Sequence, residues 1–278
     1  MDDRLPRPLF FLGAIDMMAR ISDSDYLRSD QYRDGTNLRT RMDLHERFSV
    51  NKYGWHPWVL DQLKFAPQSR VLELGCGPCF LWAENLHRVP VGWTVVLSDF
   101  SGGMLGEAQE NLRESTRRFG FVQADIQTIP FAHETFDGVI ANHMLYHVPD
   151  RQKAYGEIRR VLKPGGKFYA ATNGRVGVHR LQALMEKVEP GISSPLAGGS
   201  FSLESGGPEL EQWFSTVHVY RYEDALAVTE VDPLVDYVAS GERLSEAGLA
   251  RFRDLMAAEM AQHGVIRIEK APGMFEAY

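Results

Sequence analysis

The sequence predicts an α/β protein built on a doubly wound, mostly parallel sheet. From residue 70 onward, apolar segments of strand length alternate with segments that have the periodicity of helices. The strand candidates are apolar throughout, which is typical of a parallel sheet with helices packed on both faces. The chain has 278 residues and is 44% hydrophobic, so it can bury the core of one large domain with an insertion.

The regular part of the chain contains five strand candidates, at residues 71–75, 94–100, 121–126, 136–144 and 167–173. Three helices are expected between them, over residues 78–89, 101–115 and 151–162. Ser101 and Asp150 occupy positions from which a side chain can cap the first turn of a helix. The segment LKPGG then ends the third helix before the fifth strand.

The flanking segments are less regular, and we expect two domains. Residues 1–66 are predicted to form a helical N-terminal cap that includes a short helix at 57–63, and residues 67–278 the core. The rest of the core is predicted as a helix (175–188), a Gly/Ser/Pro-rich loop or lid insertion (about 190–212), a strand-like segment (213–222), two helices (within 232–263) and a terminal strand (265–278). We expect this last strand to run antiparallel to the others.

Charge and composition exclude several classes of partner. The formal net charge is −7 and the basic residues are scattered, so we expect no nucleic-acid partner and a small-molecule acceptor instead. The apolar run at residues 9–21 contains Asp16 and Arg20 and is too short to span a bilayer, so we expect no membrane partner. The two cysteines, Cys76 and Cys79, lack the further ligands of a structural zinc site, and their scarcity suits a reducing cytoplasm.

A glycine turn follows the first strand, in the segment VLELGCGPC (71–79). In a doubly wound sheet, ligands bind beyond the carboxyl ends of the strands, and glycines there let the backbone approach the ligand. A dinucleotide fingerprint would need a third glycine at position 80, which is Phe80. Residues 75–85 also contain no Lys or Arg to neutralise a pyrophosphate. The pattern therefore favours an adenosyl compound over a dinucleotide.

Five segments, in order, resemble the motifs of the class I S-adenosylmethionine-dependent methyltransferases, particularly the small-molecule group that includes the ubiquinone and menaquinone enzymes. They are VLELGCGPC, LSDFSGGMLGEA, QADIQTIPF, FDGVIANHMLYHVPD and RVLKPGGKFYAATN, and together they cover about residues 70–173. The resemblance implies a Rossmann-like fold and S-adenosyl-L-methionine as the cofactor. The sequence departs from the family at Cys79, where a small residue, commonly glycine, is expected, so we expect an adjusted cofactor contact there.

The resemblance also implies residue roles at the cofactor. Asp99 would hold the ribose hydroxyls, and Asp125 with the backbone of Ile126 would contact the adenine. From the residues themselves, Glu73, Asp99 and Asp125 fall near the carboxyl ends of strands, where their oxygens can meet a diol, an ammonium or an amino group. The predicted cofactor-binding residues are Tyr53, Glu73, Gly75, Cys76, Gly77, Asp99, Phe100, Met104, Asp125, Ile126 and Asn142.

The acceptor side is expected to combine the loop after the fourth strand with aromatic residues of the N-terminal cap. The candidate catalytic residues are His143, His147 and Tyr26, with His143 as the candidate base because of its near-neutral pKa. Aromatic side chains of the cap and of the segment around the insertion predict an aromatic or heteroaromatic acceptor, such as an indole, a phenol or a quinone. Such an acceptor would place the protein in specialised or quinone-type metabolism. The aromatic residues concerned are Tyr26, Tyr32, Tyr53, Trp55, Phe201, Trp213, Phe214, Tyr220 and Tyr222. A nicotinamide-dependent oxidoreductase and a catalytically silent adenosyl-binding protein remain alternatives, and a homodimer remains open.

Overall fold

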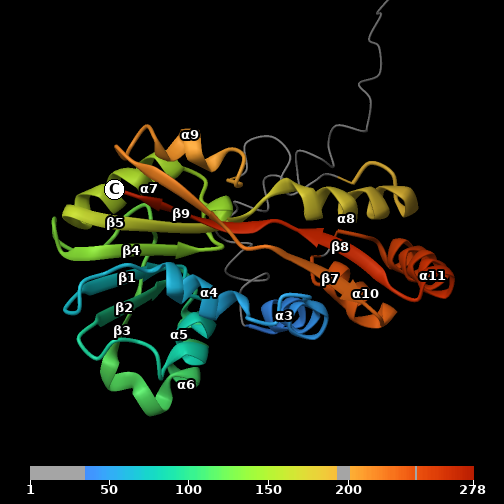
Figure 1. Cartoon of the computed structure of the whole chain (residues 1–278), viewed down its shortest axis with the longest axis horizontal. Helices are drawn as coiled ribbons and strands as arrows, with labels where there is room; N and C mark the ends of the chain where they lie inside the picture. Colours follow the sequence, from blue (N-terminus) through green and yellow to red (C-terminus); the bar gives the residue numbers. More distant parts are fainter. Residues whose placement is uncertain (1–34, 193–200, 242) are drawn as a thin grey trace, which may run out of the picture.

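A seven-stranded sheet forms the centre of the protein, in the order β3-β2-β1-β4-β5-β9-β6 (Figure 1). This computed structural model describes residues 35–192, 201–241 and 243–278. The strands of this sheet are β1 (Arg70–Leu74), β2 (Thr94–Asp99), β3 (Phe119–Gln123), β4 (Phe136–Asn142), β5 (Leu162–Asn173), β6 (Val217–Arg221) and β9 (Pro272–Ala277). The five strands from β3 to β5 are parallel, while β9 is antiparallel to both β5 and β6. The predicted fold class, with its antiparallel last strand, is confirmed.

Helices cover both faces of this sheet. They are α4 (Trp55–Gln62), α5 (Phe80–Asn85), α6 (Gly102–Asn111), α7 (Arg151–Val161) and α9 (Gly206–Leu210), with two short 3-10 helices, η3 (Arg113–Arg118) and η4 (Leu145–His147). Successive residues of one strand join different hydrophobic clusters, as Val139 packs with α7 and Ile140 with α5 and α6. This arrangement explains why the strands are apolar throughout rather than alternating.

The predicted helix starts are confirmed where a capping side chain marks them. The Ser101 side chain accepts a hydrogen bond from the Met104 N–H, and the Asp150 side chain accepts one from the Lys153 N–H. Other boundaries differ from the prediction. Helix α5 is shorter than predicted because the turn before it extends through Cys79, and β3 ends at Gln123, so Asp125 lies in the loop that follows. Strand β5 begins at Leu162, and a register shift separates its first pair with β4 from the regular pairs.

A second, two-stranded sheet continues from the edge of the first. Strands β7 (Asp224–Val228) and β8 (Ile266–Lys270) pair antiparallel, with Asp224 opposite Lys270. The prediction of one terminal strand over residues 265–278 is therefore wrong, because the chain leaves one sheet at Lys270 and enters the other at Pro272. Only two residues separate β6 from β7 and one separates β8 from β9, so a continuous ribbon links the two sheets.

Four helices surround this small sheet and form, with it, what we call the second lobe (Figure 1). They are α3 (Thr36–Phe48), α8 (Arg175–Val188), α10 (Val231–Ala239) and α11 (Glu246–His263). Their apolar residues form a third hydrophobic cluster, in which Leu44 and Phe48 of α3 meet Val228, Leu234 and Phe252. The domain boundary at residue 66 stays a prediction, but α3 shares its core with elements that lie after residue 175. No helix of the described part of the chain is both long enough and apolar enough to cross a membrane.

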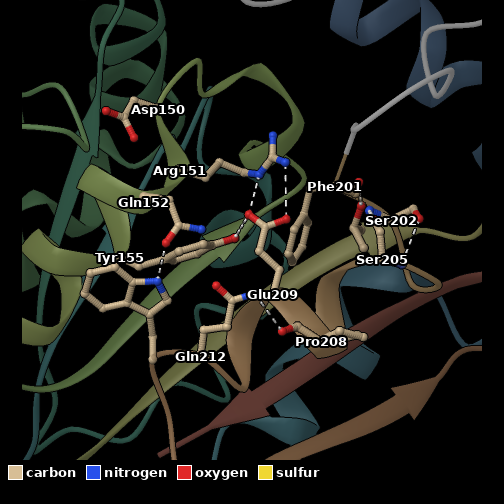
Figure 2. A network of polar contacts seen from close by, with 12 residues as sticks. Asp150, Arg151, Gln152, Tyr155, Phe201, Ser202, Ser205, Pro208, Glu209 and Gln212 are labelled. Atoms are coloured by element: carbon tan, nitrogen blue, oxygen red, sulfur yellow. Dashed lines mark hydrogen bonds and ion pairs between the residues drawn. The ribbon is translucent and has the colours of Figure 1, made fainter.

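In the insertion predicted as a loop or lid, the described residues 190–192 and 201–212 do not line the cavity at the carboxyl edge of the sheet. Phe201 and Leu210 are fully buried against β9 and α7. Figure 2 shows that Glu209 of α9 faces α7, where it accepts hydrogen bonds from Arg151 Nε (2.6 Å) and the Tyr155 hydroxyl (2.9 Å). The buried apolar side chains and the hydrogen-bonded Glu209 carboxylate together hold residues 201–212 against the side of the main sheet. Residues 193–200 lie outside the described residues.

Candidate active site

A cavity of about 700 Å³ opens at the carboxyl edge of the main sheet. One wall consists of the loops after β1, β2, β3 and β4, and the opposite wall comes from α3, the segment before α4, and the β6–β7 and β8–β9 junctions. Both junctions lie at this edge because Pro272 pairs with the last residue of β5, and β6 runs parallel to β5. Ligand cavities are typically about 300–1,000 Å³, so this one has room for a cofactor beside a second small molecule.

The glycine loop after β1 adopts a backbone that requires glycine. Gly75 has φ +66° and Gly77 has φ +53°, and a Cβ on Gly75 would lie 2.8 Å from Cγ of Met144. Asp99, the last residue of β2, fixes this loop, because its carboxylate accepts hydrogen bonds from the N–H groups of Gly77 and Ser101, each 2.8 Å long. Asp99 thus joins the loop after β1 to the loop after β2, on the wall where the sequence predicts the cofactor and which we call the cofactor wall.

The same wall is rich in buried carboxylates. Burial raises the pKa of Glu73 to about 8, despite the hydrogen bond that the Trp82 indole N–H donates to it, and the nearby Asp99 adds to the effect. Burial also raises the pKa of Asp99, although backbone N–H groups oppose the shift. Two acidic groups held in so little water favour a ligand that carries positive charge.

A further polar atom of this wall is unpaired. Asn142 Oδ1 is buried and accepts no hydrogen bond from the residues that the structure describes. The Lys and Arg residues among the described cavity residues, Arg41, Lys52 and Lys270, all belong to the opposite wall. The cofactor wall thus offers hydrogen-bond acceptors and acidic groups but, among its described residues, no Lys or Arg side chain to bind a phosphate. These groups suit a sulfonium compound that also carries hydroxyl and amino groups.

The cavity brings together most of the residues predicted from the sequence. Those that line it are Glu73, Gly75, Cys76, Gly77, Asp99, Phe100, Met104, Asp125, Ile126, Asn142, His143 and His147. Tyr53 is a correction, since it does not line the cavity and is 52% exposed; its hydroxyl donates to Asp61 on the outer surface. Its neighbour Trp55 lines the cavity instead. Tyr26 and Tyr32 lie outside the described residues.

The expected cofactor contact at Cys79 is also corrected. Cys79 is fully buried and packs in the hydrophobic cluster beneath α5, and it does not line the cavity. Its φ of +63° places it in the left-handed region, where glycine is favoured. This left-handed backbone explains why a small residue such as glycine is expected at position 79, and the Cys79 thiol faces the core.

His143, Trp55 and Tyr222 form a ring-lined wall at the acceptor end of the cavity. The His143 ring lies 5.0 Å from Trp55, and Trp55 meets Tyr222 edge-on at 5.5 Å. Burial lowers the pKa of His143 to about 3, with His56 and Lys270 adding to the shift, so its imidazole is neutral at physiological pH. His147 stacks edge-on against Tyr146 at 4.5 Å.

Of the five aromatic residues expected near the insertion, only Tyr222 lines this cavity. The other four, Phe201, Trp213, Phe214 and Tyr220, do not. Phe201, Trp213 and Phe214 pack in the core with α7 and β5, and Tyr220 donates a hydrogen bond to Glu276 (2.7 Å). The expectation of an extended aromatic wall from this segment is therefore wrong, because three of these rings pack in the core and the fourth is held by Glu276.

Sequence reasoning missed several cavity residues, and the titratable ones that matter most here are His45, Asp224 and Lys270. They lie far apart in the chain and belong to no motif. Asp224 gave a signal as the charged first residue of an otherwise apolar strand, whereas Lys270 follows two other charged residues of its strand and His45 lies within a polar helix, so neither stood out. Burial lowers the pKa of His45 to about 3, with Lys270 contributing, and its Nδ1 makes no hydrogen bond within the described residues.

The fold and the site together resemble one class of enzyme. A Rossmann-like sheet whose glycine loop is bound by an acid at the end of the second strand, with acidic side chains instead of basic ones, is the arrangement expected of the class I S-adenosylmethionine-dependent methyltransferases. Residues 72–170 match the family described as "Methyltransferase domain".

Curated relatives are similar over the same segment. The chain is 30% identical over 122 residues to the ubiquinone/menaquinone biosynthesis C-methyltransferase UbiE of Geotalea daltonii, covering 43% of this chain and 52% of the relative. It is 34% identical over 121 residues to the demethylmenaquinone methyltransferase of Desulfitobacterium hafniense, covering 43% and 47%. The chain thus spans about half the length of the curated relatives it matches.

Solved structures share the fold over more of the chain. A putative methyltransferase of Bacillus halodurans aligns with a TM-score of 0.57 at 15% identity, covering 80% of this chain and 97% of that one. Phosphoethanolamine N-methyltransferase 2 of Haemonchus contortus, in complex with phosphomonomethylethanolamine and S-adenosylhomocysteine, aligns with a TM-score of 0.57 at 18% identity, covering 92% and 60%. At these identities the likeness concerns the fold.

Proposed function

We propose that this protein is an S-adenosylmethionine-dependent methyltransferase that acts on a small aromatic or heteroaromatic acceptor. The observation that carries the proposal is the single cavity that joins the carboxylate-rich cofactor wall to the ring-lined wall of Trp55, His143 and Tyr222. The curated relatives named for ubiquinone and menaquinone methylation support an aromatic acceptor.

The cofactor supplies an activated methyl group on a positively charged sulfur when it is bound. The chain's own residues then bind, orient and exclude water. Gly75 and Gly77 admit the ligand close to the backbone, and Asp99 accepts hydrogen bonds from hydroxyl groups. Glu73 lies at the buried end of β1 with its pKa raised to about 8, and a positively charged ligand there would favour its ionised form. Because the methyl carbon is already activated, positioning the acceptor in line with it accounts for most of the catalysis.

His143 is the proposed proton acceptor for an acceptor that carries a proton. It follows β4 directly, and its backbone N–H donates to the Ala171 carbonyl (3.1 Å), which fixes the residue beside the cofactor wall. The expected near-neutral pKa of His143 is wrong, because burial lowers it to about 3. Its imidazole therefore stays neutral and keeps a lone pair, but it is a weaker base than an ordinary histidine. His147 and Tyr26, the other predicted catalytic residues, remain proposals, the latter in a segment outside the described residues.

The test is incubation of the protein with methyl-labelled S-adenosylmethionine and a panel of indoles, phenols and quinols, followed by mass spectrometry. We expect a labelled product and S-adenosylhomocysteine from at least one ring compound. Cofactor binding without transfer to any acceptor would favour a silent adenosyl-binding protein, whereas transfer confined to aliphatic amines would contradict the aromatic acceptor.

A further inference from the structure

A buried ion pair faces the acceptor end of the cavity. Lys270 Nζ lies 2.6 Å from Asp224 Oδ2, and the two residues are direct cross-strand partners at the end of the β7–β8 ribbon. Both line the cavity; the Asp224 side chain has no exposed surface and the Lys270 side chain is 18% exposed. Ion pairs are seldom buried unless their geometry is well satisfied, because removing two charges from water costs free energy.

The carboxylate of this pair has no capacity left for a ligand. Asp224 Oδ2 accepts hydrogen bonds from Lys270 and from the Ser49 hydroxyl. Its Oδ1 accepts from the backbone N–H groups of Asn51 (3.0 Å) and Ala225 (2.8 Å). A carboxylate offers about four acceptor sites, so all of them are in use. Asp224 therefore holds Lys270 in place and does not recognise the substrate.

Lys270, in contrast, retains donors. An ammonium group has three N–H donors, and among the described residues Lys270 donates only to Asp224. Two more groups on cavity residues are buried and unpaired within the described structure, the indole N–H of Trp55 and Nδ1 of His45. Buried polar groups without partners are rare in proteins and commonly await a water molecule or a ligand.

The charged residues elsewhere on this wall do not compete for the same position. Arg41 donates from Nε to the Ser240 hydroxyl (3.1 Å) and from a terminal nitrogen to the Ser240 carbonyl (2.9 Å). Glu46 and Lys52 are exposed at the rim of the cavity. A ligand that enters the acceptor end thus meets the Lys270 ammonium and the Trp55 indole N–H beside a saturated anion. Nδ1 of His45 adds a third donor in the tautomer that carries its proton on that nitrogen.

We propose that the acceptor carries an acidic oxygen group, a carboxylate or an acidic phenol, which Lys270 binds with the help of Trp55 and His45. The inference rests on the proposed function, because it concerns the acceptor end of the same cavity. The oxyanion would satisfy the unused donors of Lys270 by charge-assisted hydrogen bonds, whereas an amine would place a second cation beside it. The acceptor ring would then extend toward Trp55 and His143.

The test is calorimetric binding of two matched probe sets, with and without S-adenosylhomocysteine. The first set is indole-3-acetate, indole-3-acetamide and tryptamine, and the second is 4-nitrophenol and its methyl ether, so the sets distinguish a carboxylate from a phenol. We expect one of the acids to bind about tenfold more tightly than its neutral analogue, the size of one charge-assisted hydrogen bond. Lys270→Met should abolish this preference, and the matched rim variant Lys52→Met should keep it.

Lys270→Met leaves Asp224 buried without its partner, so a second variant, Asp224→Asn with Lys270→Met, removes both charges together. It should also lose the acid preference while its melting temperature and S-adenosylhomocysteine affinity stay close to those of the parent. The inference is overturned if neither acid binds at millimolar concentration, if the amide, ether or amine binds as tightly, or if the preference survives in both Lys270 variants. Failure of wild-type protein to bind S-adenosylhomocysteine would instead contradict the proposed function, because the acid preference is also measured without it.

Discussion

Asp99 links the glycine loop to the start of α6 and faces the cavity at the same time. Its oxygens accept hydrogen bonds from Gly77 and Ser101, and the carboxylate retains capacity for a hydroxyl group of a ligand. A single side chain thus both shapes the loop and is available for binding. Asp99 therefore differs from an ordinary helix cap, which would bind backbone N–H groups without facing a ligand cavity.

Replacing Asp99 with Ala should weaken S-adenosylhomocysteine binding by about 1–3 kcal/mol, because buried N–H groups and a ligand hydroxyl lose their partner. Isothermal titration calorimetry measures the effect. Glu110→Ala, at an exposed position on the following helix α6, is the matched control and should leave the affinity unchanged. An unaltered affinity in Asp99→Ala would remove this residue from the cofactor site.

Cys79 offers a test of backbone strain at the turn before α5. An L-residue in the left-handed region costs about 1–2 kcal/mol, a cost that glycine avoids. Both Cys79→Gly and Cys79→Ala lose the buried thiol, so their difference isolates the backbone term. We expect the Gly variant to be the more stable by about 1 kcal/mol in urea unfolding. Equal stabilities would mean that the turn holds no strain at this position.

At the scale of elements, α9 and α7 form a clamp that is separate from the cavity. Arg151 and Tyr155 of α7 both donate to Glu209, as Figure 2 shows. The indole N–H of Trp213 donates to Gln152 (2.8 Å). None of these five residues lines the cavity. The clamp therefore stabilises the insertion without contributing to ligand binding.

Glu209→Ala should lower the free energy of unfolding by about 1–3 kcal/mol, because it leaves the Arg151 and Tyr155 donors without their acceptor. Thermal unfolding gives the stability change, and calorimetry should show an unchanged affinity for S-adenosylhomocysteine. Glu211→Ala, an exposed neighbour in sequence, should alter neither quantity. A loss of cofactor affinity in Glu209→Ala would show instead that this segment reaches the ligand.

At the scale of the whole molecule, the main sheet and the second lobe enclose two neutral histidines. Burial lowers the pKa values of His45 and His143 to about 3, against an ordinary value of 6.5. The unfolded chain takes up protons on both near pH 6.5, while the folded protein does so only near pH 3. Their contribution to stability is therefore complete above pH 6.5 and is lost progressively as the pH falls toward 3.

The double variant His45→Gln with His143→Asn should lose less stability than the wild type as the pH falls. Asn suits position 143 because φ there is +56°. Between about pH 7.5 and pH 5, the melting temperature of the ligand-free wild type should fall more than that of the variant. Glu73 acts in the opposite direction, since its raised pKa favours the folded state at lower pH, but it is present in both proteins. Parallel pH profiles would contradict the assignment of the two histidines as buried and neutral.

The sequence by itself determined the main sheet, the helix caps and the cofactor wall. Apolar strands identify a parallel sheet, Ser101 and Asp150 mark helix starts, and residues at the ends of neighbouring strands must meet at one edge. These features depend on spacing within a short stretch of chain. The sequence of residues 70–173 was therefore enough to predict that six residues lie near one another at the carboxyl edge of the sheet: Glu73, Gly75, Gly77, Asp99, Asp125 and Asn142.

Only the tertiary structure decided the acceptor wall and the second lobe. Asp224 and Lys270 become partners through an antiparallel register that joins two strands 46 residues apart, and His45 reaches them from a helix near the other end of the chain. Long-range packing also brought Trp55 into the cavity, against His143 and Tyr222. Contacts of this kind depend on how distant elements pack, which no local periodicity specifies, so the chemistry of the acceptor end emerges only when the chain is folded.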